Sequence, residues 1–260
     1  MSRNSLATLL LAVILGAVSG GVAGYFAARI DSAKTVSEDE VRTAILARPE
    51  MIEEAFYALQ AKRQAKAEEQ KAKALAQSGD ALYHDARDPV IGSKDAPFVL
   101  VEFFDYNCAY CKLASKWLKN ALAEHPGKIR LVLKDFPILE GRAKGSREAS
   151  EAAWAARLQG ADKYRTFHFA LLDARGGFDS QRIDKIAKQS GIDVKRMRAD
   201  MKNNAKAFAA LLDANMSLAA SLDINGTPGF ISGDTQIAGA DTAKLQALLD
   251  AALEKAARKP

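Results

Sequence analysis

The chain has 260 residues, with 37 lysines and arginines against 32 aspartates and glutamates, which gives a formal net charge of +5. This length allows one medium-sized domain with additional segments, and such a domain has a core large enough to be stable without disulfide cross-links. The basic residues are spread through the chain and are not interleaved with aromatic residues, so the composition argues against nucleic-acid binding.

The first segment, residues 1–35, is predicted to direct export. Residues 5–28 carry no charge and are bracketed by Arg3 and Arg29. As a helix they would extend ~36 Å, which is enough to cross a bilayer. This length favours a signal anchor that tethers the protein to the inner membrane, whereas cleavage near residues 17–19 would make the segment a signal peptide and release the protein. In both cases Arg3 stays in the cytoplasm and the remainder is exported.

Residues 36–80 are predicted to form helices that end in a charged spacer. The motif Ser37-Glu38-Asp39-Glu40 is a capping box that starts a short helix, and Pro49 suits the first turn of a second helix. One face of this second helix carries apolar residues at helical spacing, namely Ile52, Ala55, Phe56 and Leu59. Beyond them the sequence is rich in alanine, lysine, glutamate and glutamine, and we expect the helix to end near Ser78.

The apolar face of this second helix has no evident core to enter. Self-association would bury Ile52, Phe56 and Leu59 against other copies of the chain. Alternatively, the segment folds back on the main domain or is a solvated helical spacer. The face is too short for a long coiled coil, which needs ~3 heptads or more. We therefore predict an oligomerisation segment and spacer over residues 36–80, with these alternatives open.

Two strands lead to the part of the chain on which the functional prediction depends. Residues 90–91 predict a short strand, and residues 98–104 are nearly all β-branched or aromatic, which predicts a strand buried on both faces. After a polar break at residues 105–107, the sequence Cys108-Ala109-Tyr110-Cys111 opens a helix that reaches Pro126. Apolar residues at helical spacing carry this helix; they are Leu113, Trp117, Leu118, Ala121 and Leu122.

Cys108 and Cys111 are predicted to form a redox pair. They are the only cysteines in the chain, so no further disulfide framework exists. Backbone N–H groups at a helix start lack intrahelical partners and can stabilise a thiolate at Cys108, while Cys111 lies one turn deeper. None of the three histidines lies at ligand spacing for zinc, and a purely structural disulfide would close a very short loop and stabilise little. We therefore predict no metal and no cofactor.

The remaining elements follow in order. Residues 129–133 predict the next strand, and the pattern is helical from about residue 146 to residue 223. Residues 229–237 predict a hairpin with its turn at Gly233-Asp234. Asp241 is expected to cap the terminal helix.

Three stretches carry a resemblance to a known family. They are Glu102-Phe-Phe-Asp-Tyr-Asn-Cys-Ala-Tyr-Cys-Lys112, Asp88-Pro-Val-Ile-Gly92 and Gly226-Thr-Pro-Gly229. Over roughly residues 85–255 the chain resembles the DsbA-like branch of the thioredoxin superfamily. With its N-terminal helices it is most similar to the suppressor-of-copper-sensitivity protein C (ScsC) group of periplasmic disulfide isomerases. The resemblance implies an α/β thioredoxin fold over residues 81–260 with a helical insertion at about 140–223, preceded by the membrane segment and the oligomerisation helices.

The resemblance also implies roles for individual residues. Glu102 matches the acid that the family keeps beneath its cysteine pair, and a buried carboxylate there would have a raised pKa and could exchange a proton with Cys111. Alternation along the strand also allows a solvent-facing Glu102. Thr227-Pro228 matches the cis-proline loop, which would face Cys108 and pair with substrate through the Thr227 backbone; an ordinary trans turn is the alternative.

The two residues between the cysteines are Ala109 and Tyr110, so the histidine that DsbA itself carries there is missing. The Tyr110 hydroxyl could partly replace the ring donor, and we expect Tyr110 to contact substrate. We predict that the pKa of Cys108 is lowered to an intermediate value and that the pair is less oxidising than that of DsbA.

The predicted function is that of a periplasmic protein disulfide isomerase or oxidoreductase that acts on protein disulfides through Cys108 and Cys111. The resemblance implies a homo-oligomer, with a trimer favoured over a dimer. The expected partners are proteins with cysteines or disulfides and a membrane redox partner that keeps the pair reduced. Two alternatives stay open: a monomeric DsbA-like oxidase that introduces disulfides, and a non-catalytic envelope module that binds metal or acts as a chaperone.

Overall fold

The computed structural model describes residues 37–258, and the predicted anchor or signal peptide lies outside them. The chain divides into two compact units, one that ends at Lys66 and one that begins at Ala67. Within residues 37–258, no helix combines the length and the apolar character that a membrane-spanning segment needs.

The first unit begins with the short helix α2 (Glu38–Ala47), followed by the long helix α3 (Glu50–Gln77), whose last turns belong to the second unit. The predicted capping box starts α2: the Glu40 N–H donates to Ser37 Oγ over 3.2 Å, and the Ser37 N–H donates to the Glu40 carboxylate over 2.9 Å. Two otherwise unpaired N–H groups are thereby satisfied, which is why the helix begins here.

The predicted apolar face is present on α3. Ile52, Phe56 and Leu59 are exposed to 59 %, 54 % and 46 %. Side chains of this size are costly to leave in water, because each would gain roughly 1.5–3 kcal/mol on full burial. The structure thus supplies a surface that could associate, and the association itself stays a prediction.

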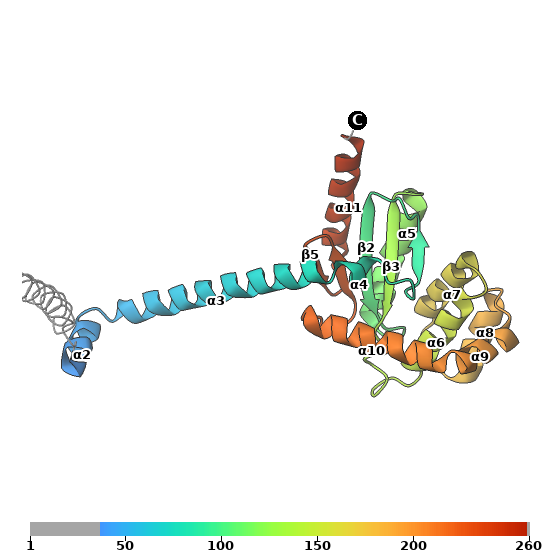
Figure 1. The fold of residues 1–260 in the computed structure, drawn as a ribbon, viewed down its shortest axis with the longest axis horizontal. Coiled ribbons are helices and arrows are strands. Elements are labelled where there is room, and N and C mark those ends of the chain that lie inside the picture. Colours follow the sequence, from blue (N-terminus) through green and yellow to red (C-terminus); the bar gives the residue numbers. More distant parts are fainter. Residues whose placement is uncertain (1–36, 259–260) are drawn as a thin grey trace, which may run out of the picture. The chain divides into compact units, whose positions relative to one another are not determined.

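The second unit is built on a five-stranded sheet with the order β1-β3-β2-β4-β5 (Figure 1). The strands are β1 (Val90–Gly92), β2 (Phe98–Phe104), β3 (Ile129–Asp135), β4 (Gly229–Ser232) and β5 (Thr235–Ala238). β2 and β3 run parallel, and the other neighbouring strands run antiparallel. A parallel pair needs a crossover, which helix α5 (Ala109–Glu124) provides. Each predicted strand is confirmed.

Five helices between β3 and β4 form the predicted helical insertion. They are α6 (Ser146–Arg157), α7 (Ala161–Asp173), α8 (Ser180–Gln189), α9 (Val194–Asn203) and α10 (Ala205–Ser221). Figure 1 shows α6 to α9 gathered beside the sheet, with α10 leading back toward it. The short helix α4 (Gly79–Tyr83) precedes β1, and α11 (Thr242–Ala257), capped by Asp241 as predicted, follows β5. The predicted α/β fold with a helical insertion is therefore confirmed.

Both faces of the sheet are covered, which explains the uninterrupted apolar sequence of β2. Leu100 and Phe104 pack with residues of α5, the insertion and α11, whereas Val101 and Phe103 pack in a second cluster with residues of α4 and α10. Because successive side chains alternate along a strand, Glu102 lies on the same face as Leu100 and Phe104, toward α5.

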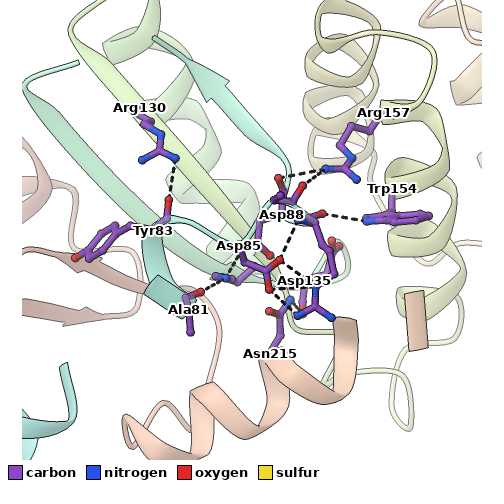
Figure 2. A network of polar contacts seen from close by, with 12 residues as sticks. Ala81, Tyr83, Asp85, Asp88, Arg130, Asp135, Trp154, Arg157 and Asn215 are labelled. Atoms are coloured by element: carbon purple, nitrogen blue, oxygen red, sulfur yellow. Dashed lines mark hydrogen bonds and ion pairs between the residues drawn. The ribbon is translucent and has the colours of Figure 1, made fainter. Parts of the chain in front are cut away.

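A polar network attaches residues 81–88, which include the end of α4 and the segment before β1, to β3 and α6 (Figure 2). Lys134 of β3 is buried, forms an ion pair with Asp88 and donates a hydrogen bond to the carbonyl of Ala81. Three further side chains donate to carbonyls of this segment: Arg130 to Tyr83 over 2.8 Å, Trp154 to Arg87 over 3.1 Å and Arg157 to Ala86 over 3.2 Å. Burial raises the pKa of Asp88 to about 6, and the charge of Lys134 opposes this rise. An unpaired buried charge is costly, so each member of the pair depends on the other.

Candidate active site

Cys108 occupies the N-cap of α5, directly after the loop that leaves β2. The Cys111 N–H points at its sulfur over 3.4 Å, and the Cys108 carbonyl accepts from the Lys112 N–H over 3.1 Å. The sulfur therefore takes the place of a capping oxygen and faces N–H groups that have no intrahelical partner. This is the arrangement that the spacing of the two cysteines predicts.

The two cysteines differ in exposure. Both are free thiols in this structure; Cys108 is 5 % exposed and Cys111 is 0 % exposed. Only Cys108 can therefore be reached from solvent without opening the fold.

The surroundings of Cys108 favour its thiolate. Hydrogen bonds from the Cys111 thiol, from the Thr227 side chain and from the backbone N–H groups of Cys111 and Tyr110 lower the pKa of Cys108 from 9.0 to about 6, although burial opposes them. At neutral pH most molecules thus carry the reactive thiolate. The predicted intermediate pKa agrees with this value.

Cys111 has the opposite tendency. Burial raises its pKa most, followed by its hydrogen bond with Cys108 and by the negative charges of Glu102 and Cys108. A backbone N–H of Asp105 opposes the rise. Cys111 is therefore a protonated thiol in the reduced protein, and it needs a proton acceptor before it can act as a nucleophile.

Glu102 lies fully buried in the centre of β2, which excludes a solvent-facing side chain. Neither of its carboxylate oxygens has a hydrogen-bond partner in the part of the chain that the structure describes. Burial, with a smaller contribution from Cys108, raises its pKa to about 8. The charge of Glu102 in turn helps to raise the pKa of Cys111, so this buried carboxylate and the cysteine pair influence one another's ionisation.

The Thr227–Pro228 peptide bond is cis, so the predicted cis-proline loop is present and the trans alternative is wrong. The Cys108 thiol donates to the Thr227 carbonyl over 3.1 Å, which brings this loop against the sulfur. Gly229 is needed at the end of the loop, because a Cβ there would lie 2.8 Å from Ile224 Cγ2. The structure thus brings the cis-proline loop, which lies 119 residues further along the chain, against the cysteine that follows β2.

Tyr110 and Leu113 are both exposed on the first turns of α5. No hydrogen bond within residues 37–258 joins the Tyr110 hydroxyl to Cys108, so the expected hydroxyl donor is replaced by the Tyr110 backbone N–H. Leu113 lies at the same helical spacing as the buried residues Leu118 and Leu122, but its own side chain is exposed. Together the two side chains form an exposed apolar surface next to Cys108.

Sequence reasoning missed Asp105, which it treats as part of a polar break. Its side chain is buried and accepts hydrogen bonds from Asn107 and Ser146. An acid directly after a buried strand and shortly before a helix N-cap was the available signal. By contrast, His168 is a buried core residue, bonded to the Tyr106 hydroxyl over 2.9 Å. Within the described residues, no group of three His, Cys, Asp or Glu side chains could hold a metal.

Comparisons with solved structures show where similar arrangements occur. A linker-deletion mutant of ScsC from Proteus mirabilis is 30 % identical with a TM-score of 0.61, over 86 % of this chain and 98 % of that one. The thiol-disulfide exchange protein alpha-DsbA2 of Wolbachia pipientis is 29 % identical with a TM-score of 0.65, over 72 % of this chain and 97 % of that one.

Among curated sequences, the Na⁺/H⁺ antiporter NhaA 1 of Mycolicibacterium vanbaalenii is 28 % identical over 166 residues, which is 64 % of this chain and 26 % of the antiporter. The chain thus spans about a quarter of the length of these curated relatives. A family model described as a DSBA-like thioredoxin domain matches residues 99–251. Because that match covers more than half of the chain and includes both cysteines and the cis-proline loop, the protein belongs to the DsbA-like thioredoxin-domain family of thiol-disulfide oxidoreductases.

Proposed function

We propose that this protein is a periplasmic thiol-disulfide oxidoreductase that acts on protein disulfides. Its main activity is proposed to be that of an oligomeric disulfide isomerase or reductase. One observation carries the proposal: a thiolate-prone Cys108 at a helix start, bonded to the cis-proline loop, lies beside a buried and protonated Cys111. Export, as predicted for residues 1–35, would place this pair in a compartment where disulfides persist.

The first step is nucleophilic. The Cys108 thiolate attacks one sulfur of a client disulfide, the client S–S bond breaks as a Cys108–client bond forms, and the other client sulfur leaves as a thiolate. The Thr227 carbonyl beside Cys108 is placed to pair with the backbone N–H of an extended client segment. The exposed Tyr110 and Leu113 would contact apolar side chains near the client cysteine.

Two routes release the client. In isomerisation, a client thiolate attacks the mixed disulfide, a different client disulfide forms and Cys108 regains its thiolate. In reduction, Cys111 passes its proton to Glu102 in the fraction of molecules in which this carboxylate has lost its own proton, and it then attacks the Cys108 sulfur. The client leaves as a thiolate and gains two electrons, and Cys108–Cys111 becomes a disulfide. The second route needs a dithiol donor to regenerate the enzyme, for which we propose a membrane redox partner.

A dithiol oxidase is the second candidate, and the lowered pKa of Cys108 favours it. A stable thiolate stabilises the reduced enzyme, which makes the enzyme disulfide a better oxidant. A value of about 6 lies in the upper half of the range of roughly 3.5–7.5 found in such motifs, which corresponds to a moderate oxidant.

Refolding of scrambled ribonuclease and reduction of insulin separate these candidates. We expect the native protein, kept reduced by a glutathione buffer, to restore ribonuclease activity and to reduce insulin, because Cys108 attacks disulfides as a thiolate. Rapid oxidation of reduced ribonuclease without reshuffling of the scrambled form would instead favour the oxidase. Inactivity in all three assays would leave only the non-catalytic alternative.

Self-association through α3 is expected to depend on its apolar face. Replacing Ile52 and Phe56 together by glutamate should convert an oligomer of residues 36–260 into monomers, because each interface would then bury carboxylates. Multi-angle light scattering measures this. Gln60→Glu on the same exposed helix adds a charge without removing apolar surface and should leave the oligomer intact. A native chain that is already monomeric would remove the support for an oligomeric isomerase.

A further inference from the structure

Asp105 is the first residue after β2, and its side chain is fully buried. One carboxylate oxygen accepts the Asn107 N–H over 2.8 Å and the Ser146 hydroxyl over 2.7 Å. The other oxygen accepts the Leu139 N–H over 2.9 Å. Three donors directed at one carboxylate hold its side chain in a single orientation.

The backbone of the same residue reaches the start of α5. The Asp105 carbonyl accepts the Cys108 N–H over 3.0 Å. The Asp105 N–H also opposes the rise in the pKa of Cys111. Asp105 is therefore bonded to Cys108 through its main chain and to the segment after β3 through its side chain.

Asn107 extends this connection. Its Nδ2 donates to Ser146 Oγ over 2.9 Å and to the carbonyls of Ala143 and Lys144 over 3.1 Å and 3.3 Å. The loop at residues 105–108 is thereby bound to residues 139–146, where the helical insertion begins. On the far side of this contact the chain approaches Phe178 so closely that only glycine fits: Gly145 has a φ of +87°, and a Cβ there would collide with the Phe178 carbonyl oxygen.

We propose that Asp105 is a positioning residue that holds the Cys108 sulfur against the N–H groups at the start of α5. The proposal rests on the proposed function only in that Cys108 is the reacting group. The contact between the sulfur and the Cys111 N–H depends on the backbone angles of Cys108, and the turn formed by residues 105–107 sets those angles. Three hydrogen bonds to the carboxylate keep that turn in place.

A positioning role and a through-space charge effect of Asp105 predict shifts of the Cys108 pKa in opposite directions when Asp105 is replaced. If Asp105 acted only as a nearby negative charge, removing it would stabilise the Cys108 thiolate and lower its pKa. If Asp105 positions the turn, removing it weakens the N–H contacts and raises the pKa. The other titratable groups that face the sulfur are Glu102 from β2 and Cys111 and Lys112 from α5, and they are unchanged in the variants below.

The experiment follows the ultraviolet absorbance of the thiolate against pH in residues 36–260, the part of the chain that is predicted to be exported. We expect Asp105→Ala to raise the pKa of Cys108 by about one unit or more. Asp105→Asn should raise the pKa of Cys108 less, because an amide keeps one acceptor oxygen. It should still raise it, because the NH₂ group cannot accept the hydrogen bonds made to the second carboxylate oxygen. Ser146→Ala removes one hydrogen bond to the carboxylate and leaves the chain's charge unchanged, so it should give a small rise.

Asn215→Ala is the matched control. Asn215 is buried and donates to the Asp135 carbonyl over 3.1 Å, and within the described residues no hydrogen bond joins its side chain to Asp105 or to either cysteine. Its replacement should lower the melting temperature without moving the pKa of Cys108. An unchanged or lowered pKa in Asp105→Ala overturns the proposal. If Asp105→Ala does not fold, Ser146→Ala provides the test: a raised pKa of Cys108 supports the proposal, and an unchanged pKa overturns it. Because this titration needs no client, a shifted pKa in a protein without disulfide exchange would refute the proposed function and leave the role of Asp105 intact.

Discussion

Cys108→Ala is expected to reduce disulfide exchange to the uncatalysed rate. It should also remove the change in thiolate absorbance near pH 6. Cys108 is the only cysteine with access to solvent and the only one with a lowered pKa. Cys111→Ala should behave differently, because it keeps the attacking sulfur and loses only the intramolecular release. We expect it to accumulate mixed disulfides with client proteins and to retain part of the ribonuclease reshuffling while insulin reduction stops.

Non-reducing gel electrophoresis and the two activity assays follow these variants. Cys111→Ser is the control for side-chain size, since a hydroxyl fills the same space without forming a disulfide. In the native protein, brief treatment with an alkylating reagent at pH 7 should modify Cys108 and leave Cys111 unmodified. Full exchange activity after selective alkylation of Cys108, or in Cys108→Ala, would contradict the assignment of the nucleophile.

Glu102→Gln is expected to change both stability and the release step. The pKa of Glu102 is raised in the folded protein from 4.5 to about 8, so the native state keeps a proton that the unfolded chain loses. This raised pKa costs stability progressively as the pH rises from about 4.5 to 8, and the whole difference corresponds to about 5 kcal/mol. Glutamine cannot ionise, so the free energy of unfolding of the variant should exceed that of the native protein increasingly toward pH 8. Urea unfolding at several pH values measures this.

The same variant should slow insulin reduction, because Cys111 loses its proton acceptor, while the first attack by Cys108 continues. Asp135→Asn is the matched control. Asp135 is also a buried carboxylate on the sheet, and burial raises its pKa to about 7. It should reproduce the change in the pH dependence of stability without slowing the release step. Equal rates of insulin reduction in the native protein and Glu102→Gln would rule out the proton transfer.

Local patterns made much of this fold predictable. β2 is apolar except for Glu102, and the helix caps at Ser37 and Asp241 lie at the predicted positions. The cis-proline loop follows from a short motif, Gly226-Thr-Pro-Gly229, through its resemblance to the family's loop. These features depend on neighbours in the chain, which a sequence displays directly.

The features that escaped prediction depend on distant partners. The orientation of Glu102 was ambiguous because both faces of β2 are buried, so alternation of polar and apolar residues gave no signal. Asp105 bonds to Leu139 and Ser146, which lie 34 and 41 residues away. Leu113 shares its spacing with buried residues, but spacing defines a helix face and not how far the protein covers it. The exposed end of α5 is where client proteins would approach.

The network around Lys134 has a consequence for how the N-terminal helices could evolve. Lys134, Arg130, Trp154 and Arg157 all donate to main-chain carbonyls of residues 81–88, whereas Asp88, Tyr83 and the fully buried Leu82 contribute side chains. A main-chain carbonyl is present whatever the residue, so substitutions at the exposed positions of this segment would preserve these hydrogen bonds. A different helical module could therefore be joined to the same catalytic unit, provided that it ends in a compatible backbone and keeps Leu82, Tyr83 and Asp88.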